Sequence, residues 1–322
     1  MTGPVALSCG EPAGIGPEIA AHAFEVLRGE LDFFLIGDPA HLPAGVPYAR
    51  IDTPREARGQ SALPVLHHAF DGPLTPGTPN PAHASAVIEV IARGVALVQS
   101  GAAAALCTAP IHKQALQDGA GFAYPGHTEY LAALAGVERV VMMLASDQLR
   151  VVPATIHIPL ADVAGALTPT LLEETIRITH AGLIRDFGLT APRIAVAGLN
   201  PHAGEGGKMG REEIDVIAPV LARLRDEGMD LRGPLSADTM FHAAARARYD
   251  AAVCMYHDQA LIPIKTLDFD RGVNVTLGLP FVRTSPDHGT ALDIAGQGIA
   301  NPTSLIEALR MAARMGAARP PA

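Results

Sequence analysis

The sequence predicts an α/β protein in which helices cover both faces of a mainly parallel sheet. Short apolar runs alternate with longer stretches of helical period, which is the pattern of repeated strand–helix–strand units. Hydrophobic residues make up 48% of the chain and charged residues 18%, as in a packed globule. At 322 residues the chain exceeds the usual size of a single core, so two core-forming lobes are expected.

The elements follow in order along the chain. Strands are predicted at the short apolar runs 5–8, 33–36, 103–107, 140–144, 151–156, 193–197 and 251–256. Helices are predicted where the apolar period lengthens, at 18–27, 84–99, 169–186, 212–227 and 303–315. The Pro- and Gly-rich segment 71–81 is expected to be a surface loop, acting as a lid or linker.

The predicted lobes are not divided by a charged linker. We therefore expect an inserted lobe at 136–283, with the metal ligands and dimer contacts, inside a first lobe formed by 1–135 plus 284–322. The last helix is expected to return to the first lobe. The Gly-rich turn near the N-terminus and the Gly-rich loop near the C-terminus both belong to that lobe.

Composition excludes several classes of function. Lys and Arg total 24 against 33 Asp and Glu, and aromatic residues make up 4% with no Trp, so nucleic acid is not an expected partner. No window of 18 uninterrupted apolar residues is present, so no membrane span is expected. The first ten residues lack the basic region of a signal peptide, which favours a cytoplasmic location. Cys9, Cys107 and Cys254 are predicted to be buried thiols.

Three histidines share one sequence context. His157, His202 and His257 each lie at or just past the end of a predicted strand. Ligands of open α/β sheets bind outside the carboxyl ends of the strands, where distant loops converge. Three imidazoles that meet there would suit a divalent ion such as Zn²⁺, Co²⁺ or Mn²⁺ and leave coordination positions open. The alternative is that each histidine is an ordinary turn residue.

Two segments suit a phosphate group. Gly126-His-Thr-Glu129 opens a predicted helix whose free N–H groups favour an anion, although a capping box is the alternative. Lys265, Asn274 and Arg283 fall in a Gly-rich stretch that supplies two cations and an amide. The alternative is solvated surface. The chain has only three lysines, Lys113, Lys208 and Lys265, all in turn-rich contexts.

A conventional dinucleotide motif is missing after the first strand. Gly10, Gly14 and Gly16 have the wrong spacing for G-x-G-x-x-G, which disfavours an ordinary Rossmann site. The loop HGTALDIAGQGIANP at 288–302, rich in Gly, Ala and Asn, precedes the last helix and is suited to a close approach by a flat ligand.

Motifs along nearly the whole chain resemble those of one known family. They are GEPAGIGPE (10–18), TAPIHK (108–113), PGHTEY (125–130), NPHAGEGG (200–207), MYHDQ (255–259) and RGVNVTLGLPFVRTSPDHGTA (271–291). On these motifs the sequence is identified as a member of the 4-hydroxythreonine-4-phosphate dehydrogenase family, PdxA. Its first and last motifs also resemble the β-decarboxylating dehydrogenases of isopropylmalate and isocitrate, which implies their fold of two α/β/α lobes with an interlobe cleft.

The resemblance implies an activity. It is the oxidation of the 3-hydroxyl of 4-phosphooxy-threonine by NAD or NADP, followed by loss of CO2 to give 3-amino-2-oxopropyl phosphate for pyridoxal phosphate synthesis. Relatives that act on erythronate or threonate 4-phosphate share these motifs, as do some aromatic dihydrodiol dehydrogenases, and these remain the alternatives. The resemblance also implies a homodimer with the metal site at the subunit interface.

Residue roles carry over from the same motifs. The implied ligands of a divalent ion (Zn, Co, Mg or Mn) are His157, His202 and His257. The implied substrate contacts, mostly to phosphate, are His127, Thr128, Lys265, Asn274 and Arg283. The cofactor contacts expected in the C-terminal loop are His288, Gly289, Thr290, Asp293 and Asn301.

The general base stays open between two residues. Asp238 would bind the metal or take a proton, unless it only caps a helix, and Lys113 is the second candidate. Two other functions are weighed against the dehydrogenase. One is a phosphate-handling transferase of similar fold without nicotinamide, and the other is a phosphometabolite sensor without turnover.

Overall fold

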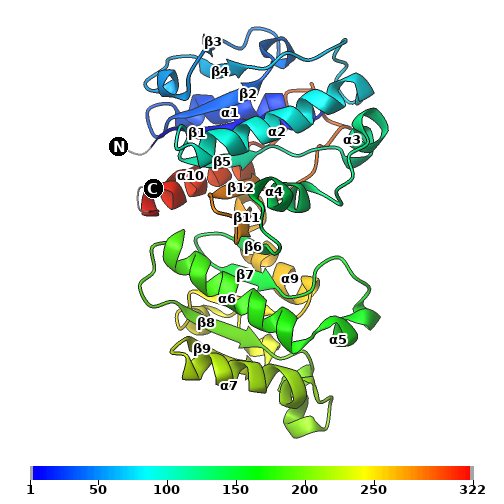
Figure 1. The fold of residues 1–322 in the computed structure, drawn as a ribbon, viewed down its shortest axis with the longest axis vertical. Coiled ribbons are helices and arrows are strands. Elements are labelled where there is room, and N and C mark those ends of the chain that lie inside the picture. Colours follow the sequence, from blue (N-terminus) through cyan, green and yellow to red (C-terminus); the bar gives the residue numbers. More distant parts are fainter. Residues whose placement is uncertain (1–2, 320–322) are drawn as a thin grey trace. The chain divides into compact units, whose positions relative to one another are not determined.

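A computed structural model describes residues 3–319 and divides the chain into two compact units. Unit 1 consists of Met1–Val140 and Leu279–Ala322, and unit 2 of Val141–Gly278. The predicted borders stood after residue 135 and before residue 284. Each unit contains both strands and helices (Figure 1).

Unit 1 carries a wholly parallel set of strands. Their order is β3 (Tyr48–Ile51), β4 (Leu63–His67), β2 (Phe33–Gly37), β1 (Val5–Ser8), β5 (Ala105–Thr108) and β12 (Arg283–Pro286). Leu7 of β1 pairs with Leu35 and with Cys107, and all three side chains are buried. Strands β1, β2 and β5 are buried along their whole length and are mainly apolar, as is typical of strands covered on both faces.

Helices cover this sheet. They are α1 (Gly16–Leu27), α2 (Ala84–Gln99), α3 (Lys113–Ala120), α4 (His127–Ala135) and α10 (Thr303–Ala318). Helix α2 packs on β1 and β5, while α10 packs on β12, β5 and α1. The last helix therefore belongs to unit 1, as predicted. Pro17 near the start of α1 fits the first turn, where its missing N–H costs nothing.

Unit 2 combines parallel and antiparallel strands. Their order is β11 (Val273–Leu277), β6 (Val141–Ala145), β7 (Arg150–Pro153), β10 (Ala251–Cys254), β8 (Arg193–Ala197) and β9 (Asp230–Leu235). Strands β7, β10, β8 and β9 run parallel, whereas β6 is antiparallel to both of its partners in this unit. The predicted α/β class with a mainly parallel sheet is confirmed.

The helices of unit 2 are α5 (Val163–Ala166), α6 (Pro169–Arg185), α7 (Ala218–Asp226), α8 (Ala243–Arg246) and α9 (His257–Asp268). Helices α6 and α7 lie side by side (Figure 1), and Arg177 of α6 pairs with Glu227 just beyond α7 at 2.6 Å. The predicted helix 212–227 begins instead as a π-helical turn at Glu213–Ile217, which leads into α7. Wider π turns are frequent near functional sites.

Several elements differ from their predicted form. Strands β3, β4, β9, β11 and β12 were not predicted. The Gly-rich stretch that holds three predicted substrate residues forms regular elements, with Lys265 on α9, Asn274 on β11 and Arg283 on β12. The predicted turn context of Lys265 is therefore wrong: α9 continues past Pro263 because Ala260, Leu261 and Ile264 are buried.

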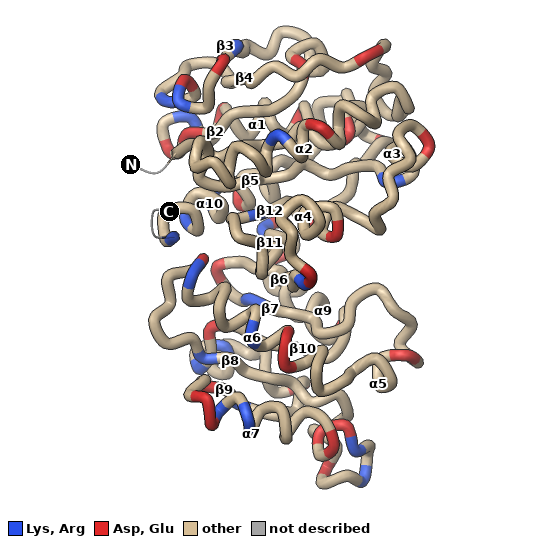
Figure 2. Tube along the Cα trace, in the orientation of Figure 1, with Lys and Arg blue, Asp and Glu red and all other residues tan. Residues whose placement is uncertain are grey.

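Two compositional predictions can be placed in the fold. Cys9, Cys107 and Cys254 are free, buried thiols, as predicted. By length and composition alone, one helical stretch, Pro81–Gln99, is apolar enough to cross a membrane. Half of it is buried, and its α2 portion covers β1 and β5, so it is a core helix here. Acidic and basic residues are interspersed in both units (Figure 2).

Candidate functional sites in each unit

In unit 2, the three predicted metal histidines follow neighbouring parallel strands. His157 follows β7, His257 follows β10 and His202 follows β8, and β10 lies between the other two. The rings of His157 and His257 are adjacent, with centroids 5.8 Å apart and planes inclined by 45°. They line a cavity of about 300 Å³ together with Ile158 and Leu160.

The geometry of this pair fits a shared divalent ion. Two imidazoles on one tetrahedral ion, with metal–nitrogen bonds of about 2.0–2.1 Å, place their centroids about 5 Å apart. The separation of 5.8 Å is close to that value. Nδ1 of His257 lies 2.7 Å from Oδ1 of Asp258. With the proton on Nδ1, this carboxylate orients the ring. The lone pair of Nε2 is then available to bind a metal ion, as for many metal-binding histidines.

His202 lies on a strained turn. Residues Pro201–Gly207 form η5, in which His202, Ala203 and Glu205 have φ of 53°, 52° and 43°. A left-handed conformation costs a residue with a Cβ about 1–2 kcal/mol. Within residues 3–319, no three or more His, Cys, Asp or Glu side chains form a group placed to hold a metal ion. The structure thus brings His157 and His257 together and leaves His202 outside that pair.

The other predicted residues of unit 2 lie on separate elements. Asp238 lies in η7 (Ala237–Thr239), which packs against η5, and its Oδ1 accepts a 2.5 Å hydrogen bond from Ser236. The ammonium of Lys265 lies 5.5 Å from the ring centroid of Phe269. Oδ1 of Asn274 is buried and has no hydrogen-bond partner in the described part of the chain, which suits a residue that contacts a ligand.

In unit 1, a cationic cluster surrounds the start of α4. Arg283 is 3% exposed, and its guanidinium donates to the Thr108 hydroxyl at the end of β5, with Nη2 at 2.7 Å. A Cβ built on Gly126 would lie 3.5 Å from Nζ of Lys113 and 3.3 Å from Oε2 of Glu129. His127 begins the helix, and its Nε2 is buried without a hydrogen-bond partner among residues 3–319. The start of α4 in unit 1 therefore brings together four predicted site residues: Lys113, His127, Thr128 and Arg283.

Burial controls the charges in this cluster. Burial, followed by the positive charges of Arg283 and Lys113, holds the pKa of His127 well below its usual value. Burial also lowers the pKa of Arg283 to about 10, so this guanidinium stays charged at neutral pH. The two cations near the neutral imidazole favour a bound anion, because an anion would offset the repulsion between the cations.

The start of α4 is not a capping box. Gly126 is the N-cap residue, and no side chain caps the helix there. The first N–H groups of α4 stay available, and Thr128 lies in this first turn. That arrangement favours the anion-binding interpretation of this segment over the structural one.

The predicted cofactor loop packs against the N-terminal turn in unit 1. Ile15 N–H donates to the carbonyl of Thr290 at 3.0 Å, and the buried Glu18 carboxylate accepts N–H groups of Gly296 and Ala300, both at 3.2 Å. A Cβ on Gly14 would lie 2.8 Å from the Thr290 carbonyl oxygen. These contacts fix the loop without using its outer face.

The individual loop residues differ in their availability to a ligand. Asn301 is engaged locally, because its Oδ1 accepts from the Thr303 N–H at 3.0 Å and from the Thr303 hydroxyl at 2.7 Å. A Cβ on Gly289 would meet nothing within 4 Å, and Asp293 is exposed. His288 has a buried Nε2 without a partner in the described chain. A ligand therefore has open access at Gly289 and Asp293.

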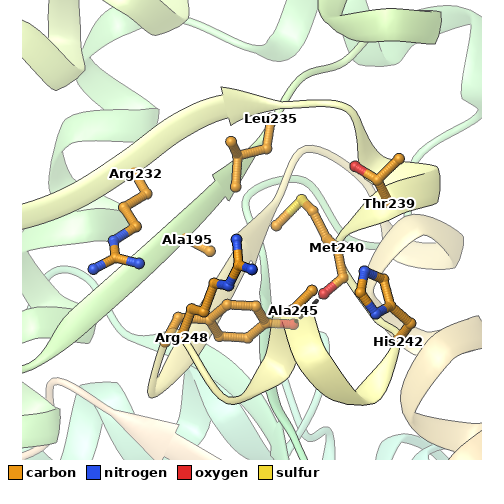
Figure 3. A pocket seen from close by; sticks show the side chains of 9 residues that line it. Ala195, Arg232, Leu235, Thr239, Met240, His242, Ala245 and Arg248 are labelled. Carbon is orange, nitrogen blue, oxygen red and sulfur yellow. Dashed lines mark hydrogen bonds between the residues drawn. The ribbon is translucent and has the colours of Figure 1, made fainter.

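Unit 2 contains a second cavity, of about 350 Å³, between β8, β9 and segment 239–249 (Figure 3). Arg232, Arg248 and His242 line it beside apolar Leu235 and Met240. The Tyr249 hydroxyl donates to the Met240 carbonyl at 2.9 Å and closes one wall. None of the predicted site residues lines this cavity.

Sequence reasoning missed the residues that support these sites. Thr108 holds Arg283, and Glu213 and Gln259 bind the backbone beside the histidine loops of unit 2. Glu213 is 3% exposed. Such residues are identified by burial and partners, because nothing in the order of residues marks a carboxylate as buried.

Comparison with known proteins gives consistent matches. A model of the family described as "Pyridoxal phosphate biosynthetic protein PdxA" matches residues 30–312. A 4-hydroxythreonine-4-phosphate dehydrogenase from Roseobacter denitrificans is 68% identical over 98% of both chains. A crystal structure of the Klebsiella pneumoniae enzyme of the same name has a TM-score of 0.90 and 38% identity, covering 98% of this chain and 100% of that one.

One similar structure has a different name. It is a terephthalate 1,2-cis-dihydrodiol dehydrogenase from Burkholderia xenovorans, which has a TM-score of 0.68 and 30% identity and covers 97% of this chain and 98% of that chain.

Proposed function

The chain belongs to the PdxA family, and on that premise we propose that it oxidises and decarboxylates 4-hydroxythreonine 4-phosphate with NAD or NADP. It is an oxidoreductase of vitamin B6 biosynthesis with the activity of a 4-hydroxythreonine-4-phosphate dehydrogenase. In the proposed reaction the hydroxyl carbon gives a hydride to nicotinamide and the hydroxyl proton goes to a base. The carboxylate of the resulting β-keto acid leaves as CO2, and a proton replaces it to give 3-amino-2-oxopropyl phosphate.

The observation that carries the metal-dependent form of this proposal is the pair formed by His157 and His257. Their ring centroids are 5.8 Å apart, and the Asp258 carboxylate lies 2.7 Å from Nδ1 of His257. We assign His202 as the third ligand, because it follows the adjoining parallel strand. A divalent ion bound there would stabilise negative charge on the substrate oxygen, and nicotinamide would accept the hydride.

We assign phosphate binding to the cationic cluster of unit 1. Arg283 is held by Thr108 and keeps its charge in a buried setting. The neutral imidazole of His127 and the free N–H groups at the start of α4, where Thr128 lies, would donate hydrogen bonds to phosphate oxygens. In unit 2, Lys265 and Asn274 are proposed as further substrate contacts.

Two residues are proposed to move the hydroxyl proton. Asp238 is exposed next to the His202 turn, and its carboxylate accepts a hydrogen bond from the Ser236 hydroxyl. Lys113 lies beside the start of α4. We favour Asp238 as the base, because Lys113 lies among other cations that attract the phosphate.

The cofactor is proposed to lie along the outer face of the 288–302 loop. Gly289 allows the backbone to be approached closely, and His288, Thr290 and Asp293 flank it. Asn301 is proposed to act indirectly, by accepting the Thr303 N–H at the start of α10, where the loop ends. Contacts of Gly14 and Glu18 with the loop fix its conformation before any ligand binds.

We propose that the active form is a homodimer in which a second copy covers the His157–His257 cavity. Leu160 and Ile158 in this cavity wall are 70% and 39% exposed, and Ile262 on α9 is 61% exposed. Large apolar side chains gathered beside a polar site favour a protein partner.

The dimer proposal predicts the effect of one charge. Leu160→Asp should shift the protein from dimer to monomer in sedimentation velocity and reduce turnover with it, because a carboxylate would be buried at the interface. Val26→Asp is the control, since Val26 is 54% exposed on α1 of unit 1. A Leu160→Asp protein that stays dimeric would remove this surface from the interface.

The proposed reaction is tested with a substrate panel. The purified protein is incubated with NAD or NADP, a divalent ion and, in separate reactions, 4-hydroxythreonine 4-phosphate, erythronate 4-phosphate or threonate 4-phosphate. Absorbance at about 340 nm follows the reduced cofactor, and mass spectrometry identifies the product. Faster turnover of a sugar acid than of the amino acid would replace the proposed substrate.

A further inference from the structure

We propose that Glu213 is a positioning residue that holds the left-handed turn carrying His202 in its ligand-presenting conformation. This inference rests on the proposed function only for the role of His202 as a ligand. The positioning of the turn itself is independent of any metal. Glu213 has no other assigned role in the site described above.

The turn needs an external restraint. His202, Ala203 and Glu205 all have positive φ, and the intervening Gly204 has φ of 78°. Side chains with a Cβ disfavour this conformation, so the segment persists only where its surroundings fix it. His202 and Glu205 are exposed, so packing of their own side chains does not supply that restraint.

The Glu213 carboxylate supplies it. This side chain is 3% exposed, and its Oε1 accepts the backbone N–H of Asn200 at 2.7 Å. Its Oε2 accepts from Nδ2 of the same asparagine at 3.0 Å. Asn200 is the residue just before the turn, so both oxygens act at the point where the chain enters η5.

The turn also closes around this carboxylate. A Cβ on Gly204 would lie 2.6 Å from Oε2 of Glu213, and a Cβ on Gly198 would lie 2.9 Å from its Oε1. Backbone before and after His202 therefore contacts the same buried group. A carboxylate that accepts from two donors binds them more strongly than a neutral acceptor does.

A second link ties this region to the other histidines. Nε2 of Gln259 donates to the carbonyl of Gly198 at 2.8 Å, and its Oε1 accepts the N–H of Met255 at 2.7 Å. Gln259 is on α9, the helix that begins with His257. The chain that leads from β8 to His202 is therefore fixed by Glu213 on one side and by the His257 helix on the other.

The test is Glu213→Gln, with Asp215→Asn as the matched control. The amide would place a donor against the donors of Asn200, whereas Asp215 is exposed and pairs with Arg211 at the surface. Hydrogen exchange of amides 202–210 is measured in the metal-free protein. We expect at least about tenfold faster exchange in Glu213→Gln and no change in Asp215→Asn.

Cobalt binding provides the second readout. Co²⁺ affinity and the visible absorption of the bound ion are measured on the full chain, and residues that orient metal ligands typically change affinity by about 10–100-fold. We expect a loss of that size in Glu213→Gln. Adding Glu205→Gly should restore part of it, because glycine adopts the left-handed conformation without strain.

The outcomes separate the two proposals. Unchanged exchange of the turn in Glu213→Gln overturns the positioning role, whatever the metal does. Faster exchange with unchanged Co²⁺ affinity overturns its connection with the metal site. If the wild-type protein binds no Co²⁺ and the exchange still increases, the turn is positioned as inferred and the metal-dependent function fails. If Glu213→Gln unfolds, hydrogen exchange is compared between Glu205→Gly and the wild-type protein. The inference then requires slower exchange of the turn amides in Glu205→Gly, and equal or faster exchange overturns it.

Discussion

The two units build their polar sites in different ways. In unit 1, Arg283 is buried, Nε2 of His127 is buried, and the backbone around them is closely packed. In unit 2, His157 and His202 are exposed on loops, and the side chain of His257 is 38% exposed. The first site is desolvated in advance and favours an anion. The second exposes its imidazoles to water, and under the proposed function they would be covered only when an ion and a second copy bind.

The largest expected effect is on the exposed site. His257→Ala should lower metal-dependent kcat/KM by at least about 100-fold, because it removes one imidazole of the adjacent pair and the ring that Asp258 orients. Its thermal stability should change little, since the ring is partly solvated. Turnover is measured across a metal titration. His242→Ala, in the second cavity of unit 2, is the control. Equal activity of the two variants would place the metal elsewhere.

A smaller effect is expected at the buried cation. Arg283→Lys should raise KM for the phosphorylated substrate by about 10–100-fold, because a lysine cannot reproduce the guanidinium fork held by Thr108. The change should be much smaller for a dephosphorylated substrate. Arg310→Lys is the control, since Arg310 pairs with Glu30 on the surface of unit 1. A loss in kcat with KM unchanged would assign Arg283 to the chemical step.

Two glycines of unit 1 distinguish packing from ligand access. Gly14→Ala should lower the free energy of unfolding by about 1–3 kcal/mol, because its Cβ would lie 2.8 Å from the Thr290 carbonyl oxygen. Gly289→Ala has open space around the new Cβ, so stability should be unchanged while KM for the cofactor rises. Denaturant unfolding and cofactor titration measure the two quantities. Unchanged cofactor KM in Gly289→Ala would move the cofactor off this loop.

The sequence predicted the location of the histidines better than their arrangement. Strands β7, β8 and β10 are mainly apolar, so the strand ends that precede His157, His202 and His257 could be predicted from the sequence. The left-handed turn at His202 could not, because the sequence does not show that the nearby Glu213 carboxylate is buried against the residues that precede the turn.

The same limit applied to the substrate residues. Asn274 and Arg283 were placed in a Gly-rich stretch for which no strand was predicted, yet both lie on strands. Strand β11 has only five residues, and Gly272 and Gly278 bound it closely, so no strand was predicted there. Pairing with β6 within unit 2 decided the outcome, and that contact joins residues more than a hundred positions apart.

The smallest expected effect is on the pH dependence of stability. Burial lowers the folded-state pKa of His127, His41 and His68, so the unfolded chain binds more protons at these groups. Their contribution is fully present above the unfolded pKa of about 6.5 and is lost as the pH falls below it. His127→Asn should reduce the slope of unfolding free energy with pH below that value by up to about 1.4 kcal/mol per unit. His22→Asn, on the exposed face of α1, is the control. Equal slopes in wild type and His127→Asn would mean that the imidazole titrates normally and that the cluster in unit 1 is not desolvated in advance.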